Sequence, residues 1–363
     1  MITGREFLHG STTGIGSMPH RDVAAALSLI RENMPLGPHW PQLPGLGGEE
    51  SFARQYLAPL LKLNILGLKK GEAPFFYDLE EDWPEREQAF YELYLDALEN
   101  EQGEKAAMGF FAFPREAARG FYAFLEGVWS SREGTKPLFV KGQISGPLSL
   151  GLQINSADGK AAFYHPGLRD ILVKNLALQA KSQVRALKKF SLPVIIFIDE
   201  PALLSFGQSA YTALASEDIS AALEEIIFAI KEEGAMVGVH SCAGIDWSIP
   251  FNLPLDIVNF DAYEYFDSLL VYAEEMDAFL KKGGILAWGL IPTSEAIEEE
   301  ETAVLKERFL RGIERLANRG VGADLLKKQY MLTPSCGTGT LAMAQAEKVY
   351  RLTSELQAAL KQI

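Results

Sequence analysis

The chain has 363 residues, and its 34 lysines and arginines against 48 aspartates and glutamates give a formal net charge of −14. This acidic balance argues against nucleic acid as a partner, because phosphate binding needs clustered basic residues. No apolar run approaches the roughly 20 residues that span a bilayer, and the first ten residues lack the pattern of a signal peptide. We therefore expect a cytoplasmic protein with no membrane partner.

Short apolar runs alternate with longer stretches of helical periodicity along the chain. The run 193–198 is apolar at every position after its proline, which is typical of a parallel strand buried on both faces. Similar patterns predict strands at 13–17, 75–77, 138–140, 193–198, 235–239, 255–260, 285–288 and 329–332. Helical periodicity predicts helices at 21–33, 85–99, 168–189, 219–233, 265–281, 298–317 and 341–360.

About eight such β–α units predict an α/β protein, a (β/α)8 TIM barrel formed as a single domain over residues 1–363. A doubly wound sheet is the rival architecture. In a barrel, the chemistry comes from residues at the C-terminal ends of many strands. Polar residues follow the predicted strands in this chain: Ser17 to His20, Gln143 to Pro147, Asp199 to Pro201, His240 to Cys242, Asp261 to Glu264 and Pro334 to Gly339. Their positions predict one shared pocket.

His240, Cys242 and Cys336 are candidate ligands for a soft metal. His240 and Cys242 are separated by one residue, so both can point the same way at the end of a strand. Cys336 ends a different strand, which barrel closure would bring near. Two thiolates, an imidazole and one oxygen ligand suit a tetrahedral zinc site. The alternative is that both cysteines are small buried hydrophobic residues. Two cysteines are too few for a disulfide framework.

Four segments resemble, in the same order, the catalytic half of cobalamin-independent methionine synthase, and more broadly the uroporphyrinogen decarboxylase/methionine synthase superfamily. They are Thr12 to His20, Ile198 to Leu203, His240 to Cys242, and Pro334 to Gly337. The resemblance covers nearly the whole chain and is to a stand-alone short form, without the second, N-terminal barrel of the full-length synthases.

The resemblance implies a (β/α)8 barrel that binds catalytic Zn²⁺ and activates the thiol of homocysteine for attack on a methyl donor. This is a methyltransferase reaction, that of a 5-methyltetrahydropteroyltriglutamate–homocysteine S-methyltransferase, and it yields methionine. In this sequence His240, Cys242 and Cys336 match the metal ligands. Ser17 matches a contact to the amino acid, and Asp199 matches the carboxylate that holds the substrate ammonium group.

The chain departs from the family at the fourth metal ligand and at the methyl donor. The family's glutamate ligand aligns with Asp261, which is one methylene shorter, and Glu264 lies three residues further on. We prefer Asp261 and keep Glu264 as the alternative. The folate-binding residues find no clear match, and related enzymes use methyl-corrinoid proteins. The donor is therefore open between methyltetrahydrofolate and a methyl-corrinoid protein.

Three further residues carry candidate roles. Asp199 and Glu200 end an all-apolar run, and a buried carboxylate is costly unless it is paired. Asp199 is expected to bind a substrate cation, with a pair to a lysine or arginine of the barrel as the alternative. Glu200 either contacts the substrate or orients His240. His20 is a candidate acid for the leaving group, or else a surface or capping residue.

Two other functions remain open from the residues alone. The first is a barrel that binds a metal or an amino acid without catalysis. The second is a metal-free decarboxylase of the porphyrinogen type, which needs arginines at the strand ends. The sequence offers Arg5 and Arg21 near the N-terminus but no arginine cluster at the predicted strand ends.

Overall fold

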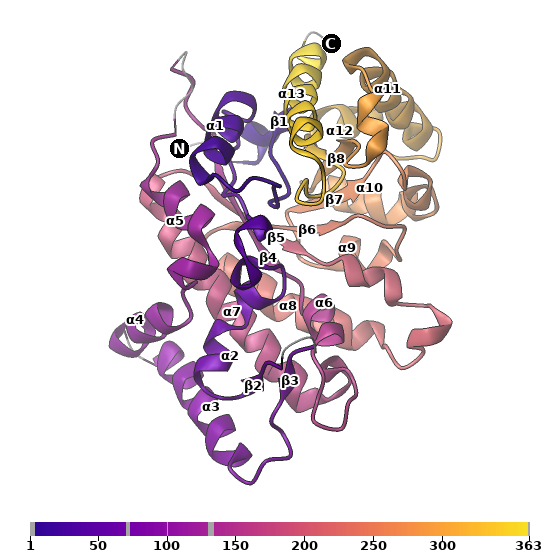
Figure 1. Ribbon diagram of the computed structural model, residues 1–363. Helices are drawn as coiled ribbons and strands as arrows, with labels where there is room; N and C mark the ends of the chain where they lie inside the picture. Colours follow the sequence, from indigo (N-terminus) through magenta and orange to yellow (C-terminus); the bar gives the residue numbers. More distant parts are fainter. Residues whose placement is uncertain (1–3, 70–72, 100, 130–133, 362–363) are drawn as a thin grey trace.

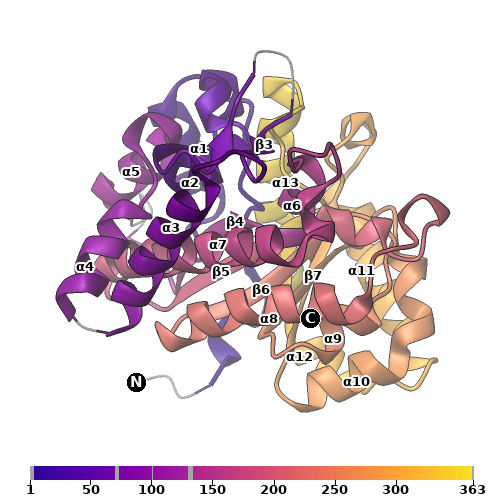
Figure 2. The ribbon, with the colours of Figure 1, turned by 90° about the horizontal axis from the view of Figure 1, so that it is seen from below.

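The structure is a computed structural model that describes residues 4–69, 73–99, 101–129 and 134–361. Its centre is a curled sheet of parallel strands with helices packed around the outside (Figures 1 and 2). This confirms the α/β class and the parallel pairing predicted from the apolar runs. Among the described residues, no helix is long and apolar enough to cross a membrane.

The main sheet has seven strands in the order β1-β9-β8-β7-β6-β5-β4, and every neighbouring pair is parallel. From β4 to β9 the order follows the chain, as expected when each strand is followed by a helix on the same side, and β1 pairs with the last strand, β9. The strands are β1 (Ser11–Thr12), β4 (Val140–Ser145), β5 (Val194–Asp199), β6 (Met236–Ser241), β7 (Ile257–Asp261), β8 (Ile285–Ile291) and β9 (Tyr330–Pro334).

An irregular segment, residues 38–42, lies between the edge strand β4 and the residues that follow β1. On one side, Lys141 of β4 donates its N–H to Pro38 O at 2.9 Å. On the other side, the Gln42 N–H donates to Gly16 O at 3.0 Å, and the Met18 N–H donates to Gln42 O at 2.9 Å. These contacts are isolated bridges rather than a strand, so the described sheet has seven strands where eight were predicted.

The strands separate an inner apolar cluster from a larger outer core. In β5, Ile195 and Phe197 belong to the inner cluster, whereas Ile196 and Ile198 pack with the helices. Because successive side chains of a strand point to opposite faces, a strand covered on both sides must be apolar throughout. This is why the run 193–198 shows no alternation of apolar and polar residues.

The helices cover the outer face of the sheet. The first helix, α1, begins after Asp22, whose carboxylate accepts the N–H of Ala24 at 2.8 Å and caps the helix. It packs beside the last helix, α13. The helices are α1 (Val23–Asn33), α2 (Ala58–Lys62), α3 (Trp83–Glu99), α4 (Glu101–Phe110), α5 (Arg119–Glu126), α6 (Pro147–Gln153), α7 (Pro166–Leu187), α8 (Ser216–Glu232), α9 (Ser248–Asn252), α10 (Ala273–Lys281), α11 (Thr302–Ala317), α12 (Ala323–Lys328) and α13 (Met343–Leu360).

Two strand predictions were wrong in detail. The first strand is β1 at Ser11–Thr12 and not 13–17, because the chain leaves the β9 ladder before Gly16, whose φ of +156° suits glycine. Phe75–Phe76 forms β3, which pairs antiparallel with β2 (Leu66–Gly67) in a separate small sheet. It therefore does not belong to the central parallel sheet.

Candidate metal and thiol site

One cavity lies at the C-terminal ends of the central strands. It has a volume of about 500 Å³. β5 ends at Asp199, β6 at Ser241 and β9 at Pro334, so residues of three strands reach it. The parallel register places Asp199 beside His240, and His240 beside Asn259. The cavity is lined by Ile15, Ser17, Gln42, Pro44, Gly45, Glu50, Phe52, Asp199, Pro201, His240, Cys242, Cys336, Gly337, Gly339 and Thr340.

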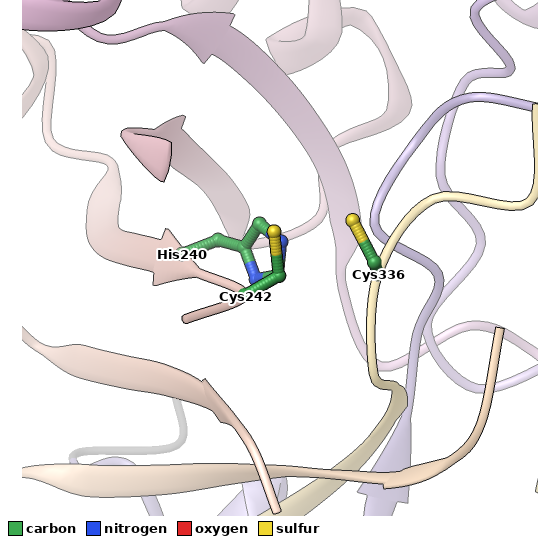
Figure 3. A group of neighbouring side chains, drawn as sticks. All are labelled: His240, Cys242 and Cys336. Carbon is green, nitrogen blue, oxygen red and sulfur yellow. The ribbon is translucent and has the colours of Figure 1, made fainter. Parts of the chain in front are cut away.

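His240, Cys242 and Cys336 come together in this cavity. Their potential ligand atoms, one imidazole nitrogen and two Sγ atoms, all lie within 4.8 Å of one another. Figure 3 shows His240 and Cys242 side by side from β6 and the residue after it, with Cys336 opposite them on the segment after β9. The structure thus assembles the three residues that the sequence analysis selected from separate strands.

Asn259 sets the tautomer of His240. Its side-chain NH₂ group donates to Ala287 O and to Thr333 Oγ1, both at 2.8 Å. The remaining Asn259 Oδ1 can only accept, so the imidazole Nδ1 that contacts it carries the proton. The other ring nitrogen, Nε2, is then an unprotonated lone pair. It is buried and has no hydrogen-bond partner.

The two thiols form a hydrogen bond with each other, so the pKa of each depends on the charge of the other. A hydrogen bond from Cys336, together with His240, lowers the pKa of Cys242. The same contact with Cys242, along with burial, raises the pKa of Cys336. Burial lowers the pKa of His240, but the neighbouring Cys242 and Asp199 outweigh this, so its net shift is upward. Once one thiol of this pair has ionised, the other is harder to ionise.

This donor set fits zinc. Two sulfurs and one imidazole nitrogen are the ligands that Zn²⁺ takes in proteins. The imidazole is held through its other nitrogen by a hydrogen-bond acceptor, as histidine ligands of metals usually are. The buried Nε2 and the two sulfurs also lie close enough together to act as ligands of one cation.

Two carboxylates in the cavity each have one buried oxygen without a partner. Burial raises the pKa of Asp199 to about 6, even though Lys141 and His240 act in the opposite direction. Asp199 Oδ1 accepts no hydrogen bond. Glu50, which also lines the cavity, pairs through Oε1 with Arg119 at 3.2 Å while its Oε2 has no partner. Such oxygens are suited to receive a cationic group from a ligand.

Ser17 lies against the turn that follows Cys336. The Thr338 N–H donates to Ser17 O at 2.8 Å, and the Gly339 N–H donates to Ser17 Oγ at 3.4 Å. A Cβ added at Gly337 would overlap Ser17 Oγ. The glycine at 337 is therefore what allows the cysteine-bearing turn to approach Ser17.

The structure does not bring His20 or Glu200 to the cavity. His20 is buried near Glu347 of α13, and burial lowers its pKa. Glu200 is turned toward α6, where its oxygens accept the N–H groups of Leu148 at 2.8 Å and Ser149 at 2.7 Å. Its carboxylate thus caps the first turn of that helix, and Asn259 is the residue that orients His240.

The two candidates for a fourth metal ligand lie apart from the cluster of three. Asp261 is buried, and its Oδ1 accepts the N–H groups of Tyr263 at 2.9 Å and Glu264 at 2.8 Å. Burial raises its pKa to about 6, and the charge on nearby Cys242 adds to that rise. Glu264 is exposed and lines a different cavity. Of the two, Asp261 is the one that interacts with the thiols.

Sequence reasoning missed Asn259 and Glu50. Asn259 is a lone amide inside the apolar stretch of β7, two residues before Asp261 and therefore on the same face. Because side chains alternate along a strand with a period of two, the sequence could have placed Asn259 on the same face as Asp261. Glu50 lies in a short helical turn, Gly48–Glu50, of a loop-rich segment with no periodicity to place it, and only the folded chain brings it to the cavity.

Comparisons with known proteins add a distant structural likeness. No protein-family model matches the chain, and no curated protein matches it. Among solved structures, the chain is similar to a B12-independent methionine synthase from Shewanella sp. W3-18-1 in complex with selenomethionine, with a TM-score of 0.44 and 15% sequence identity. The match covers 61% of this chain and 62% of that chain, less than two thirds of either. A likeness of this size does not extend to the activity.

Proposed function

We propose that this protein is a zinc-dependent S-methyltransferase that methylates a small thiol, with homocysteine as the acceptor. The observation that carries the proposal is the buried, unpartnered Nε2 of His240 beside the thiols of Cys242 and Cys336. The resemblance of four sequence segments to cobalamin-independent methionine synthase supplies the identity of the acceptor. We also propose that residues 1–363 form one barrel domain, with segment 38–42 in the place of its eighth strand.

In this proposal His240, Cys242 and Cys336 hold Zn²⁺, and Asp261 is the fourth protein ligand. Bound zinc lowers the pKa of a thiol that reaches it and so keeps a thiolate available at neutral pH. Asn259 holds the imidazole with Nε2 toward the thiols. The cysteine turn is held in place by its backbone contacts with Ser17.

Asp199 and Glu50 bind the ammonium group of the substrate. Each has a free buried oxygen on the cavity wall, and an amino acid with a thiol side chain would satisfy both while its sulfur points at the cysteines. Ser17 also lines the cavity and contacts the amino acid in this proposal. A buried carboxylate favours a cationic partner over water because the low dielectric strengthens the pair.

The reaction is a direct displacement. The thiolate sulfur forms a bond to the methyl carbon, and the bond from that carbon to the donor breaks. The electron pair leaves with the donor, which is either N5 of methyltetrahydrofolate or the cobalt of a methyl-corrinoid protein. With folate, the leaving nitrogen also takes up a proton. Since His20 does not line the cavity, we do not assign that proton to it.

The alternatives are weakened by what lines the cavity. A porphyrinogen-type decarboxylase needs arginines to hold acetate groups, and none of the described residues that line this cavity is an arginine. A barrel that only binds a metal or an amino acid would need no place for a substrate thiol at the metal, whereas Asp261 lies apart from the three clustered ligands, so a thiol can replace it there.

The deciding experiment measures zinc per chain and methyl transfer on the same protein. We expect one zinc in the wild type, loss of zinc in Cys242→Ser and Cys336→Ser, and retention in the neighbouring control Ser335→Ala. Transfer to homocysteine is then assayed with methyltetrahydrofolate and with methylcobalamin as separate donors. Zinc without transfer from either donor would favour the binding protein, and no zinc after metal-replete, reducing expression would refute the proposal.

A further inference from the structure

A second cavity lies outside the sheet, between α11, β8 and the loop that follows β7. Its volume is about 430 Å³. Trp288 of β8 lines it from the sheet side, and Tyr263 and Phe266 line it from the loop after β7. Trp288 packs with the outer core, whereas the preceding Ala287 belongs to the inner cluster. The two cavities share no lining residue.

Three arginines of α11 line this cavity: Arg308, Arg311 and Arg315. Their spacings of three and four residues place them on one face of the helix. Two of them are held against aromatic rings. The guanidinium of Arg308 lies 4.3 Å from the ring centre of Tyr263, and that of Arg315 lies 5.1 Å from the ring centre of Phe266. Stacking on a ring leaves the edge of a guanidinium free to donate hydrogen bonds.

The carboxylates near these arginines do not fully occupy them. Arg308 reaches Glu300 only at 4.0 Å, and Arg311 pairs with Glu307 along the same helix at 2.9 Å. Arg315 pairs with Asp267 at 2.7 Å, but the Asp267 side chain is 78% exposed. Ion pairs this open to water contribute little and exchange readily. Each guanidinium has five N–H donors, so most of them remain available.

Among the residues that line the cavity, positive charges outnumber negative ones, and Glu300 and Glu307, which pair with Arg308 and Arg311, lie outside the lining. The cavity has three arginines against the carboxylates of Glu264 and Asp267, in a protein whose formal net charge is −14. An excess of hydrogen-bond donors with positive charge in a concave, aromatic-walled site favours an anionic ligand.

We propose that this cavity is a second ligand site that binds an oxyanion of a small molecule, a carboxylate or a phosphate, through Arg308, Arg311 and Arg315. Both groups present paired oxygens that match the fork of a guanidinium. The aromatic walls accommodate the apolar body of the ligand while its charged end contacts α11.

Titration calorimetry on the full-length, zinc-loaded protein tests this site, with inorganic phosphate, pyrophosphate and citrate as probes at constant ionic strength. We expect at least one probe to bind with 1:1 stoichiometry. Replacing all three arginines, as Arg308→Gln/Arg311→Gln/Arg315→Gln, should weaken that binding by about tenfold or more, since each lost bidentate pair removes charge-assisted hydrogen bonds. Tighter binding of pyrophosphate than citrate would identify a phosphate ligand, and the reverse order a carboxylate.

The control is Arg319→Gln, which removes an exposed arginine just beyond α11 that does not line the cavity. Binding that is equally weak in this control and in the triple variant, or unchanged in both, would overturn the proposal, as would the absence of binding by all three probes. The result is separable from the methyltransferase proposal, because the zinc-free Cys242→Ser protein should bind the anion as the wild type does.

Discussion

His240 of β6 and Asn259 of β7 face each other across neighbouring strands, and the imidazole Nδ1 donates to the amide oxygen. The amide can only accept there, because its NH₂ group already donates to Ala287 and Thr333. A single side chain in the sheet therefore determines which nitrogen of the histidine is free. The paired strands hold Asn259 in place, so the tautomer of His240 is set before any metal binds.

Asn259→Ala removes the acceptor for Nδ1 and lets the imidazole rotate or change tautomer. We expect zinc affinity to fall by about 10- to 100-fold, measured by competition with a chromogenic chelator. Asn259→Asp keeps an acceptor at this position and should retain more of the affinity than the alanine variant. Asn318→Ala, at an exposed position after α11, serves as the control. Equal zinc affinity in all four proteins would contradict this role.

Asp261 and Glu264 form a matched pair for the fourth ligand. Asp261→Asn should weaken zinc binding, because the buried carboxylate interacts with Cys242. Glu264→Gln should leave zinc binding unchanged, because Glu264 is exposed and lines the second cavity, the one with the three arginines of α11. Chelator competition on the two variants measures both effects. The opposite order would move the ligand assignment to Glu264.

Glu200 is predicted to stabilise the fold without affecting the metal. In Glu200→Gln, an NH₂ group faces backbone N–H donors of α6 that now contact the carboxylate. The mismatch should cost about 1–3 kcal/mol in free energy of unfolding, measured by urea denaturation. Zinc stoichiometry should stay at the wild-type value. Loss of zinc in this variant would restore a role for Glu200 beside His240.

From the raised pKa of Glu200 we also predict that the free energy of unfolding depends on pH. Burial raises the pKa of Glu200 from its ordinary 4.5 to about 7. Between these values the folded state holds a proton that the unfolded state has released, so stability falls as pH rises through this range. The contribution is on the order of 3 kcal/mol. Denaturation of the metal-free protein at pH 5 and pH 8 should show a smaller decrease for Glu200→Gln than for the wild type.

Gly337→Ala should disturb the cysteine turn through Ser17. The new methyl group would overlap Ser17 Oγ, and overpacking of this kind costs about 1–3 kcal/mol. Removing the hydroxyl in the double variant Ser17→Ala/Gly337→Ala should recover part of the loss. Thermal unfolding of the wild type, both single variants and the double variant gives the coupling free energy between positions 17 and 337. Purely additive effects would show that the contact is unimportant.

Asp199 and Glu50 are predicted to act on substrate binding more than on the metal. Asp199→Asn and Glu50→Gln each remove a negative charge from the cavity wall and should raise the KM for homocysteine about tenfold or more. The zinc content should be unchanged in both. Gln42→Ala changes the same wall without changing charge and is the control. A fall in kcat with an unaltered KM would argue against a role in holding the ammonium group.

The local sequence was enough to select three candidate ligands that cluster in the fold and to predict the parallel strands. The apolar run 193–198, and the polar residues His240, Cys242 and Cys336 after other runs, are properties of short segments. They could be interpreted because the side-chain period of a strand and the burial of a parallel sheet are local rules.

Other features depended on which segments meet in space. Glu200 follows the same strand as Asp199, yet it serves α6 because that helix begins beside it. Asn259 gained its role only when β6 and β7 paired in register, and Glu50 only when a loop without periodicity reached the cavity. The sequence by itself determined which residue types end each strand. The tertiary structure decided their partners, because hydrogen bonds and ion pairs join atoms that are far apart along the chain and have no local pattern.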